Sequence, residues 1–478
     1  MPARRQRPPS ENHFDVIVVG AGAAGLTAAA ELAEAGRSVI VLEARDRSGG
    51  RMFTRHEPHS TVPIELGAEF IHGRPPEIWD ALREHKVPIT EVGGDNWCVR
   101  KGRIAECDFF PDVDKILQRM DDSGLDESFQ DFLHRCCPRA SKEAKQHALS
   151  YVSGFNAADP ALVSVHWLVQ QMKAEEKIDG ERAFRARHGY STLLEILRER
   201  VAKKNVTIAT NTVVERVTWN RGKVMIDGTS NGSPVSFQAR RAVITVPLGV
   251  LQAPRGERGS IEFRPALPEE KLKALSGLDM GKVVRVVLHF RERFWSKLSP
   301  YGNKTKTLDD MSFLFSQDEY FPTWWTAMPR HAPVITGWAA FRCAERVAEN
   351  KTPVVDRSLQ TLNRLLKVDR AKLAGLLRDA HFHDWQNDPF SRGAYSYTKS
   401  GAMHASATLG SPVEDTLFFA GEATDVSGNN GTVHGAIASG RRAVADIARA
   451  ETPAQVRQSS GLAQNFRSPI RTRAKRNS

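Results

Sequence analysis

The residues most clearly arranged for chemistry lie near the N-terminus and include three closely spaced glycines, Gly20, Gly22 and Gly25. They follow the β-branched run 14–19 and open an alanine-rich stretch, 23–35, that predicts a helix. A second apolar run, 38–42, ends at Glu43. In a strand–turn–helix–strand unit this spacing lets the backbone approach a pyrophosphate, and the acid accepts hydrogen bonds from ribose hydroxyls. The sequence therefore predicts a dinucleotide-binding unit.

The segment that follows Glu43 narrows the choice of dinucleotide. Residues 44–51 contain two adjacent glycines between arginines, a composition that suits a loop lying against phosphate groups. With this run the sequence resembles the flavin-containing amine oxidase superfamily. That superfamily includes monoamine oxidases, polyamine oxidases, flavin-type histone-lysine demethylases and L-amino-acid oxidases.

Further segments resemble the same superfamily in the same order along the chain, at 64–73, 242–251, 384–397, 418–424 and 431–436. The resemblance spans roughly residues 14–449 and implies an α/β fold. It consists of a Rossmann-like FAD-binding domain interleaved with an α+β substrate domain. We expect FAD-binding pieces at 13–90, 205–270 and 381–450, and substrate-domain pieces at 91–204 and 271–380.

The resemblance also implies which residues hold FAD. They are Gly20, Gly22, Ala24, Gly25, Glu43, Ala44, Arg45, Gly50, Arg51, Leu66, Gly67, Ala68, Glu69, Val214, Gly421, Glu422, Thr432 and Val433. Monoamine oxidases attach the flavin through a cysteine, and Ala394 stands at that position here. We therefore expect non-covalent FAD. No metal site is expected.

On the substrate side the resemblance implies an aromatic wall made by Trp385 and Tyr395, with Thr432 near the flavin edge. Monoamine oxidases have a tyrosine where Thr432 stands, so the chain is most similar to the polyamine oxidase side of the superfamily.

One position departs from the superfamily pattern. A lysine usually stands ten residues before the tryptophan of a Phe-Trp pair, where it holds a water against the flavin and assists reaction with oxygen. Counting back from Trp295 gives Arg285, and the nearest lysine, Lys282, has the odd offset that points to the opposite face of a strand. Guanidinium and ammonium groups differ in shape and hydration. We therefore expect Arg285 to permit reduction by substrate and to slow reoxidation by oxygen.

The implied reaction is oxidation of a polyamine or a primary or secondary amine to an imine by hydride transfer to flavin N5. Hydrolysis then gives a carbonyl compound and an amine, with oxygen or another acceptor taking the electrons. An L-amino-acid oxidase or a carbon–carbon desaturase on the same fold is the alternative. A third class is a non-enzymatic flavoprotein or a chromatin binder that uses the basic tails. The intact aromatic wall argues against a non-enzymatic protein, and no inserted tower or added reader domain is visible to support a demethylase role.

Several other residues allow two interpretations. Glu69 and His72 either bind a charged substrate nitrogen or serve the loop structurally, Glu69 by pairing with an arginine. His434 is expected to pack or cap near the flavin, and Trp324 and Trp325 are expected to be core aromatics.

Composition is that of a globular protein, with 41% hydrophobic and 26% charged residues in 478. The net charge of +11 is concentrated in the ends, because residues 452–478 hold six Lys or Arg and no acid. The segments 1–12 and 451–478 therefore predict disordered basic tails, with no specific nucleic-acid partner.

No apolar run is long enough for a membrane span. The five cysteines fit no metal pattern and are expected to be free thiols in a reducing cytoplasm. We expect a monomer or homodimer.

The secondary-structure pattern predicts a mostly helical region at about 75–200. Strands are expected at 205–208, at 213–219, 223–226 and 236–239 as a meander, and at 242–246 as a separate buried run.

Overall fold

The computed structural model describes residues 13–107, 109–301 and 305–451. The predicted basic tails lie outside these ranges, except that Glu451 is the last residue of helix α14 (Val433–Glu451). Within the described residues, no helix is both long and apolar enough to cross a bilayer.

An eight-stranded sheet forms the first lobe and is assembled from three separated parts of the chain. Its strands are β10 (Thr207–Ala209), β2 (Val39–Leu42), β1 (His13–Val19), β13 (Ser233–Ile244), β12 (Lys223–Ser230), β11 (Thr212–Asn220) and β14 (Glu262–Arg264) in spatial order, with β22 (Leu417–Phe419) paired to β13. The β-branched residues of β1 and β2 are buried on both faces, as in parallel sheets. The chain thus has the predicted α/β architecture with a Rossmann-like sheet.

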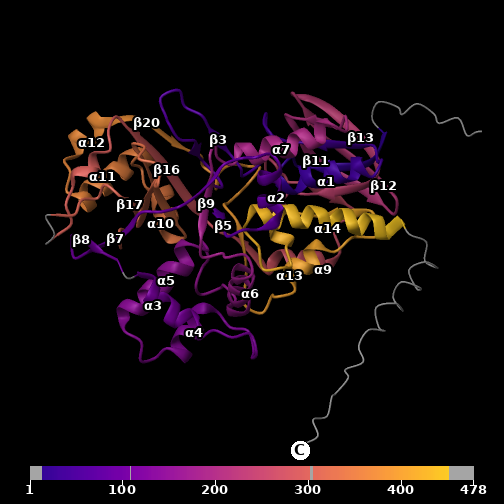
Figure 1. The fold of residues 1–478 in the computed structure, drawn as a ribbon. Coiled ribbons are helices and arrows are strands. Elements are labelled where there is room, and N and C mark those ends of the chain that lie inside the picture. The colour runs from indigo at the N-terminus through magenta and orange to yellow at the C-terminus, as the bar shows by residue number, and fades with distance from the viewer. Residues whose placement is uncertain (1–12, 108, 302–304, 452–478) are drawn as a thin grey trace, which may run out of the picture.

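Helices from both ends of the described chain cover this sheet. Helix α1 (Ala23–Glu34) packs along α14, and Figure 1 shows the indigo and yellow helices side by side. Helices α2 (Pro76–Glu84) and α7 (Ser191–Ala202) complete the layer. Alanines at 28, 29 and 30 of α1 are fully buried, which allows close approach of α14 and the sheet.

A seven-stranded sheet forms the second lobe. Its spatial order is β20 (Leu377–Phe382), β16 (Val283–Phe290), β19 (Val334–Ala340), β18 (Thr323–Thr326), β17 (Met311–Phe315), β7 (Asp95–Arg100) and β8 (Arg103–Glu106). One face packs on α10 (Arg342–Glu349), α11 (Val354–Leu366) and α12 (Arg370–Leu376) around buried Trp295 and Trp324. The other face looks toward the first lobe (Figure 1).

Four helices lie together below the two lobes in Figure 1, namely α3 (Phe109–Leu117), α4 (Phe129–Cys136), α5 (Lys142–Gly154) and α6 (Val165–Glu176). Three of them begin at serine N-caps, Ser128, Ser141 and Ser164, whose hydroxyls accept backbone N–H groups of the first turn. A small sheet of β5 (Ile71–His72), β9 (Ala183–Ala186) and β6 (Ile89–Glu91) joins this region to the first lobe.

The remaining short elements connect these layers. They are β3 (Thr54–Arg55), β4 (Ile64–Glu65), α8 (Leu248–Leu251), α9 (Glu269–Ser276), β15 (Leu278–Met280), β21 (Ser396–Thr398), α13 (Ala405–Gly410) and the 3-10 turns η1 (Phe294–Lys297) and η2 (Glu422–Thr424).

The structure corrects three sequence-based predictions. Residues 75–200 are not mostly helical throughout, because β6, β7, β8 and β9 interrupt the helices. The runs 236–239 and 242–246 are not separate strands, because β13 pairs continuously with β12 and then with β1. The prediction of five free thiols is wrong, because the β7–β8 hairpin brings Cys98 to Cys107 and a disulfide joins them. The cysteines therefore no longer argue for a reducing compartment.

Candidate active site

A large cavity opens where the parallel strands of the first sheet end. Gly20, Glu43, Thr245 and Gly421 follow the carboxyl ends of β1, β2, β13 and β22, and all four line it. Ligands of open α/β sheets bind at this edge. The cavity volume of about 2290 Å³ exceeds the 300–1,000 Å³ typical of a small-ligand pocket, so it has room for a cofactor and a substrate together.

The glycine turn after β1 leaves space for a phosphate group. Gly20 has φ +105°, and a Cβ on Gly25 would lie 1.9 Å from the Gly20 carbonyl oxygen, so only glycine allows helix α1 to pack on the strand. A Cβ on Gly22, by contrast, would meet no protein atom within 4 Å. This open cradle at a helix N-terminus fits the pyrophosphate of a dinucleotide.

Acids and arginines around this cradle fix its loops. The carboxylate of Glu43 is buried and accepts the backbone N–H groups of Ala21 (2.8 Å) and Arg45 (3.0 Å). The Arg45 guanidinium donates to Asp388 at 2.8 Å. The Arg45 guanidinium is therefore held by a protein acid, although the sequence suggested a loop that lies against phosphate groups.

Arg51 and Glu422 tie the loop after β2 to the C-terminal part of the chain. The Arg51 guanidinium donates to Glu422 (2.8 Å) and to the Ala394 carbonyl (2.7 Å). The second oxygen of Glu422 accepts from the Ser396 hydroxyl (2.5 Å) and the Gly431 backbone N–H (2.9 Å). Arg51 and Glu422 therefore join these segments of the cavity wall to one another.

The structure brings the predicted site residues together. Every residue named above for FAD lines the cavity except Gly25, which packs behind the turn, and Arg285, Trp385 and Tyr395 line it as well. The Trp385 indole donates to the Leu66 carbonyl at 2.7 Å. The Tyr395 hydroxyl donates to the Phe155 carbonyl at 2.6 Å. Both aromatic side chains are thus fixed in orientation.

Thr432 lies at the cavity edge, but its hydroxyl is used by the backbone. It donates to the Asn429 carbonyl (2.7 Å) and accepts from the Gly435 N–H (3.0 Å), so it caps the start of α14. His434, on the first turn of α14, is buried with its ring 3.1 Å from the Asn429 amide oxygen. Its position matches the packing role that the sequence favoured.

Arg285 lies on β16, buried at the cavity wall, and is held by a charge network. Its guanidinium donates to the Gly67 carbonyl at 2.7 Å and pairs with Glu69. Arg185 (2.8 Å) and the indole of Trp325 (3.0 Å) also donate to Glu69. Burial raises the pKa of Glu69, but the charges of Arg285 and Arg185 outweigh it, so the pKa lies below its ordinary value.

Ion pairs decide two sequence-based interpretations. Glu69 pairs with arginines, so its carboxylate is not open to a substrate nitrogen. Lys282 precedes β16 and pairs with Glu345 on the surface at 2.8 Å, so it is no substitute for Arg285.

A row of aromatic rings that the sequence did not identify lines the substrate side. Trp325, Phe70, His72, Phe155 and Tyr151 follow one another with centroid separations of 5.6, 6.1, 5.4 and 5.3 Å. Trp325 was expected in the core. Because successive residues of a strand face opposite sides, Trp324 fills the core of the second lobe while Trp325 faces the cavity, and this alternation was a usable signal.

Two histidines that line the cavity, His72 and His434, are electrically neutral near pH 7. Burial lowers the pKa of His72 to about 4. Burial, with a smaller effect of nearby His72, lowers the pKa of His434 to about 4. The wall between Arg285 and Tyr151 is therefore aromatic and uncharged.

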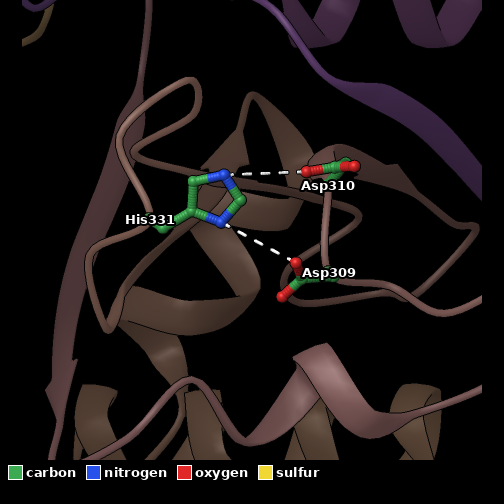
Figure 2. Close-up of side chains that lie close together, drawn as sticks. All are labelled: Asp309, Asp310 and His331. Carbon is green, nitrogen blue, oxygen red and sulfur yellow. Dashed lines mark ion pairs between the residues drawn. The ribbon is translucent and has the colours of Figure 1, made fainter.

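A separate surface cluster consists of Asp309, Asp310 and His331 (Figure 2). The His331 ring lies 3.9 Å from Asp309 and 3.7 Å from Asp310. Arg293 already donates to Asp309 at 2.9 Å and lies 2.7 Å from the same ring. An arginine thus supplies the positive charge that this cluster pairs with.

Comparison with known proteins identifies the family. The model of the flavin-containing amine oxidoreductases matches residues 23–126 and 117–448. Polyamine oxidase 2 of Arabidopsis thaliana is 28% identical, with 90% of this chain and 87% of that protein aligned. Lysine-specific histone demethylase 1 homolog 3 of the same plant is 29% identical over 89% of this chain, which spans only 29% of that protein.

Solved structures share the fold. Wild-type putrescine oxidase bound to putrescine superposes with a TM-score of 0.74 at 21% identity, covering 91% of this chain and 99% of that one. Cyclohexylamine oxidase from Brevibacterium oxydans gives 0.72 at 20% identity, with 91% and 99% covered. The chain therefore belongs to the flavin-containing amine oxidoreductase family, and its cofactor is a flavin.

Proposed function

We propose that this enzyme oxidises a polyamine or a primary or secondary amine at the carbon next to nitrogen, giving an imine that water splits into a carbonyl compound and an amine. When bound, FAD supplies the two-electron acceptor for the hydride equivalent that leaves this carbon. The observation that carries the proposal is the apolar aromatic lining of the cavity between Arg285 and Tyr151.

The residues of the wall favour the reactive form of an amine. A lining of rings with neutral His72 and His434 disfavours a charged ammonium at the reacting end and promotes its deprotonation. Trp385 and Tyr395 are fixed by hydrogen bonds to Leu66 and Phe155, so they hold the substrate without reorganising. No carboxylate base is required for an amine that reacts in its neutral form.

Arg285 has the role of a fixed cation in this proposal. It is anchored by Glu69 and the Gly67 carbonyl, so it cannot swing or release a proton as a lysine ammonium can. We propose that the reductive half-reaction proceeds while reoxidation by oxygen, which would give hydrogen peroxide, is slow. Another electron acceptor then competes with oxygen.

The same network disfavours the alternative of an L-amino-acid oxidase. Such an enzyme needs an arginine free to grip the substrate carboxylate. Arg285, the arginine beside the aromatic row, is already paired with Glu69, as is its neighbour Arg185. An amine without a carboxylate is the better fit.

The test is anaerobic mixing of the purified holoenzyme with polyamines, monoamines and L-amino acids while the visible flavin band is followed. Bleaching by amines but not by amino acids supports the proposal. Bleaching by amino acids alone, or by no amine in the panel, would replace it with the amino-acid or desaturase alternative.

A further inference from the structure

Helix α6 presents one face to the cavity along its whole length. Trp167, Gln171 and Glu175 are spaced four residues apart, so they share this face, and all three line the cavity. The Trp167 indole donates to the Asn430 side chain at 3.1 Å, close to Thr432. Glu175 follows eight residues later, about 12 Å further along the helix axis. The helix therefore connects the α14 end of the cavity to a distant carboxylate.

The carboxylate of Glu175 differs in its contacts from those of Glu43, Glu69 and Glu422, which also line the cavity and are buried or half-buried. Glu43, Glu69 and Glu422 are all held by backbone N–H groups, a hydroxyl or arginines. Among the described residues, Glu175 has no hydrogen-bond or ion-pair partner for its side chain, although it is partly buried. Burial, with a smaller contribution from Glu181, raises its pKa to about 7. A half-buried carboxylate without a partner is stabilised in its charged form when a cation binds beside it.

The position of Glu175 is fixed by its backbone. The Gly180 N–H donates to the Glu175 carbonyl at 2.8 Å, and a Cβ on Gly180 would lie 2.6 Å from the Glu175 Cβ. Gly73, next to His72, packs against the same turn, because its N–H donates to the Arg182 carbonyl at 2.7 Å. The side chain therefore projects from a rigid turn beside the aromatic row.

The row of rings ends beside this carboxylate. Burial raises the pKa of the Tyr151 hydroxyl, and the negative charge of Glu175 raises it further, as expected for neighbouring groups. From Tyr151 the rings lead through Phe155 and His72 toward the Arg285 network. Such a row suits the methylene groups of an extended chain, with a charged end at Glu175.

We propose that Glu175 binds a second ammonium group of the substrate, so that the enzyme prefers di- or polyamines whose charged nitrogen lies far from the oxidised carbon. This inference rests on the proposed amine oxidation and narrows its substrate class. A monoamine of equal length would leave the carboxylate unpaired, whereas a diamine would neutralise it. Glu69, the acid that the sequence suggested for this role, is already paired.

The test compares 1,8-diaminooctane with octylamine, which differ only in the terminal ammonium group. Calorimetric titration of the wild-type holoenzyme is expected to show at least tenfold tighter binding of the diamine. Glu175→Gln is expected to raise the Kd of the diamine at least tenfold and to change that of octylamine less than twofold. Glu199→Gln removes the same charge at an exposed position of α7 that does not line the cavity, and is expected to leave both Kd values within twofold.

Equal Kd values for the two amines in the wild type, or a preference for the diamine that survives in Glu175→Gln, would overturn the inference. If Glu175→Gln does not retain flavin, the wild-type ratio alone decides. Flavin reduction is followed separately. Binding with the expected preference but without bleaching would refute the proposed oxidation and leave the ammonium site in place.

Discussion

Removal of the negative charge of Glu69 is expected to destabilise the enzyme strongly. In Glu69→Gln the guanidinium groups of Arg285 and Arg185, whose side chains are only 5% and 18% exposed, lose the anion that neutralises them. Breaking a buried ion pair by deleting one partner typically costs about 3–5 kcal/mol. That is a large fraction of the roughly 5–15 kcal/mol by which folded proteins are stable.

The assay is urea unfolding at pH 7.5, followed by tryptophan fluorescence and by release of the flavin. Glu34→Gln is the matched control, because Glu34 pairs with Arg200 at 3.1 Å on the surface, where an ion pair contributes little. We expect a clearly lower urea midpoint for Glu69→Gln and almost no change for Glu34→Gln. Equal midpoints for the two variants would show that the network contributes no stability.

The pH dependence gives an independent check. Because the pKa of Glu69 in the folded state lies below its ordinary value of 4.5, its contribution is complete above that value and is lost as the pH falls further. The gap between wild type and Glu69→Gln should therefore narrow below pH 4.5. A gap that widened on acidification would contradict the assigned charge.

Three further outcomes are expected. Arg285→Lys should be reoxidised by oxygen roughly tenfold faster or more in stopped-flow experiments, and equal rates would refute the role given to the guanidinium. In Gly22→Ala the added Cβ meets no protein atom but enters the cradle, so the variant should fold with a normal circular dichroism spectrum and purify with a reduced flavin-to-protein absorbance ratio. Gly124→Ala, where the added Cβ also meets no protein atom, is the control and should keep its flavin. Because the pKa values of His72 and His434 are lowered from 6.5 to about 4, thermal stability should fall as the pH drops from 6.5 toward 4.5, and His72→Asn should show a shallower decline. Parallel pH curves would mean that folding does not shift the pKa of His72.

The parts of the site that sequence reasoning found are those built from local signals. The glycine turn, the helix after it and Glu43 lie within one short strand–helix–strand unit, so their spacing alone identifies the cradle. Counting back from Trp295 led to Arg285, and β16 directs this side chain to the cavity wall, whereas Lys282 lies before the strand.

The parts that sequence reasoning missed depend on contacts between distant segments. Glu69 meets Arg185 and Arg285 across 116 and 216 residues, so nothing near Glu69 indicated that its charge was already neutralised. Glu175 stands in a charged helix end that resembles a solvated surface, and only the packing of α6 against the cavity sets it apart.

Dependence on a distant segment also explains why the sequence did not predict the β7–β8 hairpin and its disulfide. The β7–β8 segment is polar and short, and it is stabilised as a strand pair by the neighbouring strand β17 rather than by its own pattern. Once the hairpin forms, Cys98 and Cys107 have Cα atoms 5.0 Å apart, a distance that a disulfide can bridge. Cysteine counting without the hairpin predicted free thiols.

The central claim is that the cavity supports oxidation of an amine at the carbon next to nitrogen. The most direct measurement is an anaerobic single turnover of the holoenzyme with a diamine, in which flavin bleaching and carbonyl product are quantified in the same sample. The account predicts one equivalent of aldehyde for each flavin reduced. Flavin reduction without a carbonyl product, or with an alkene in its place, would contradict it.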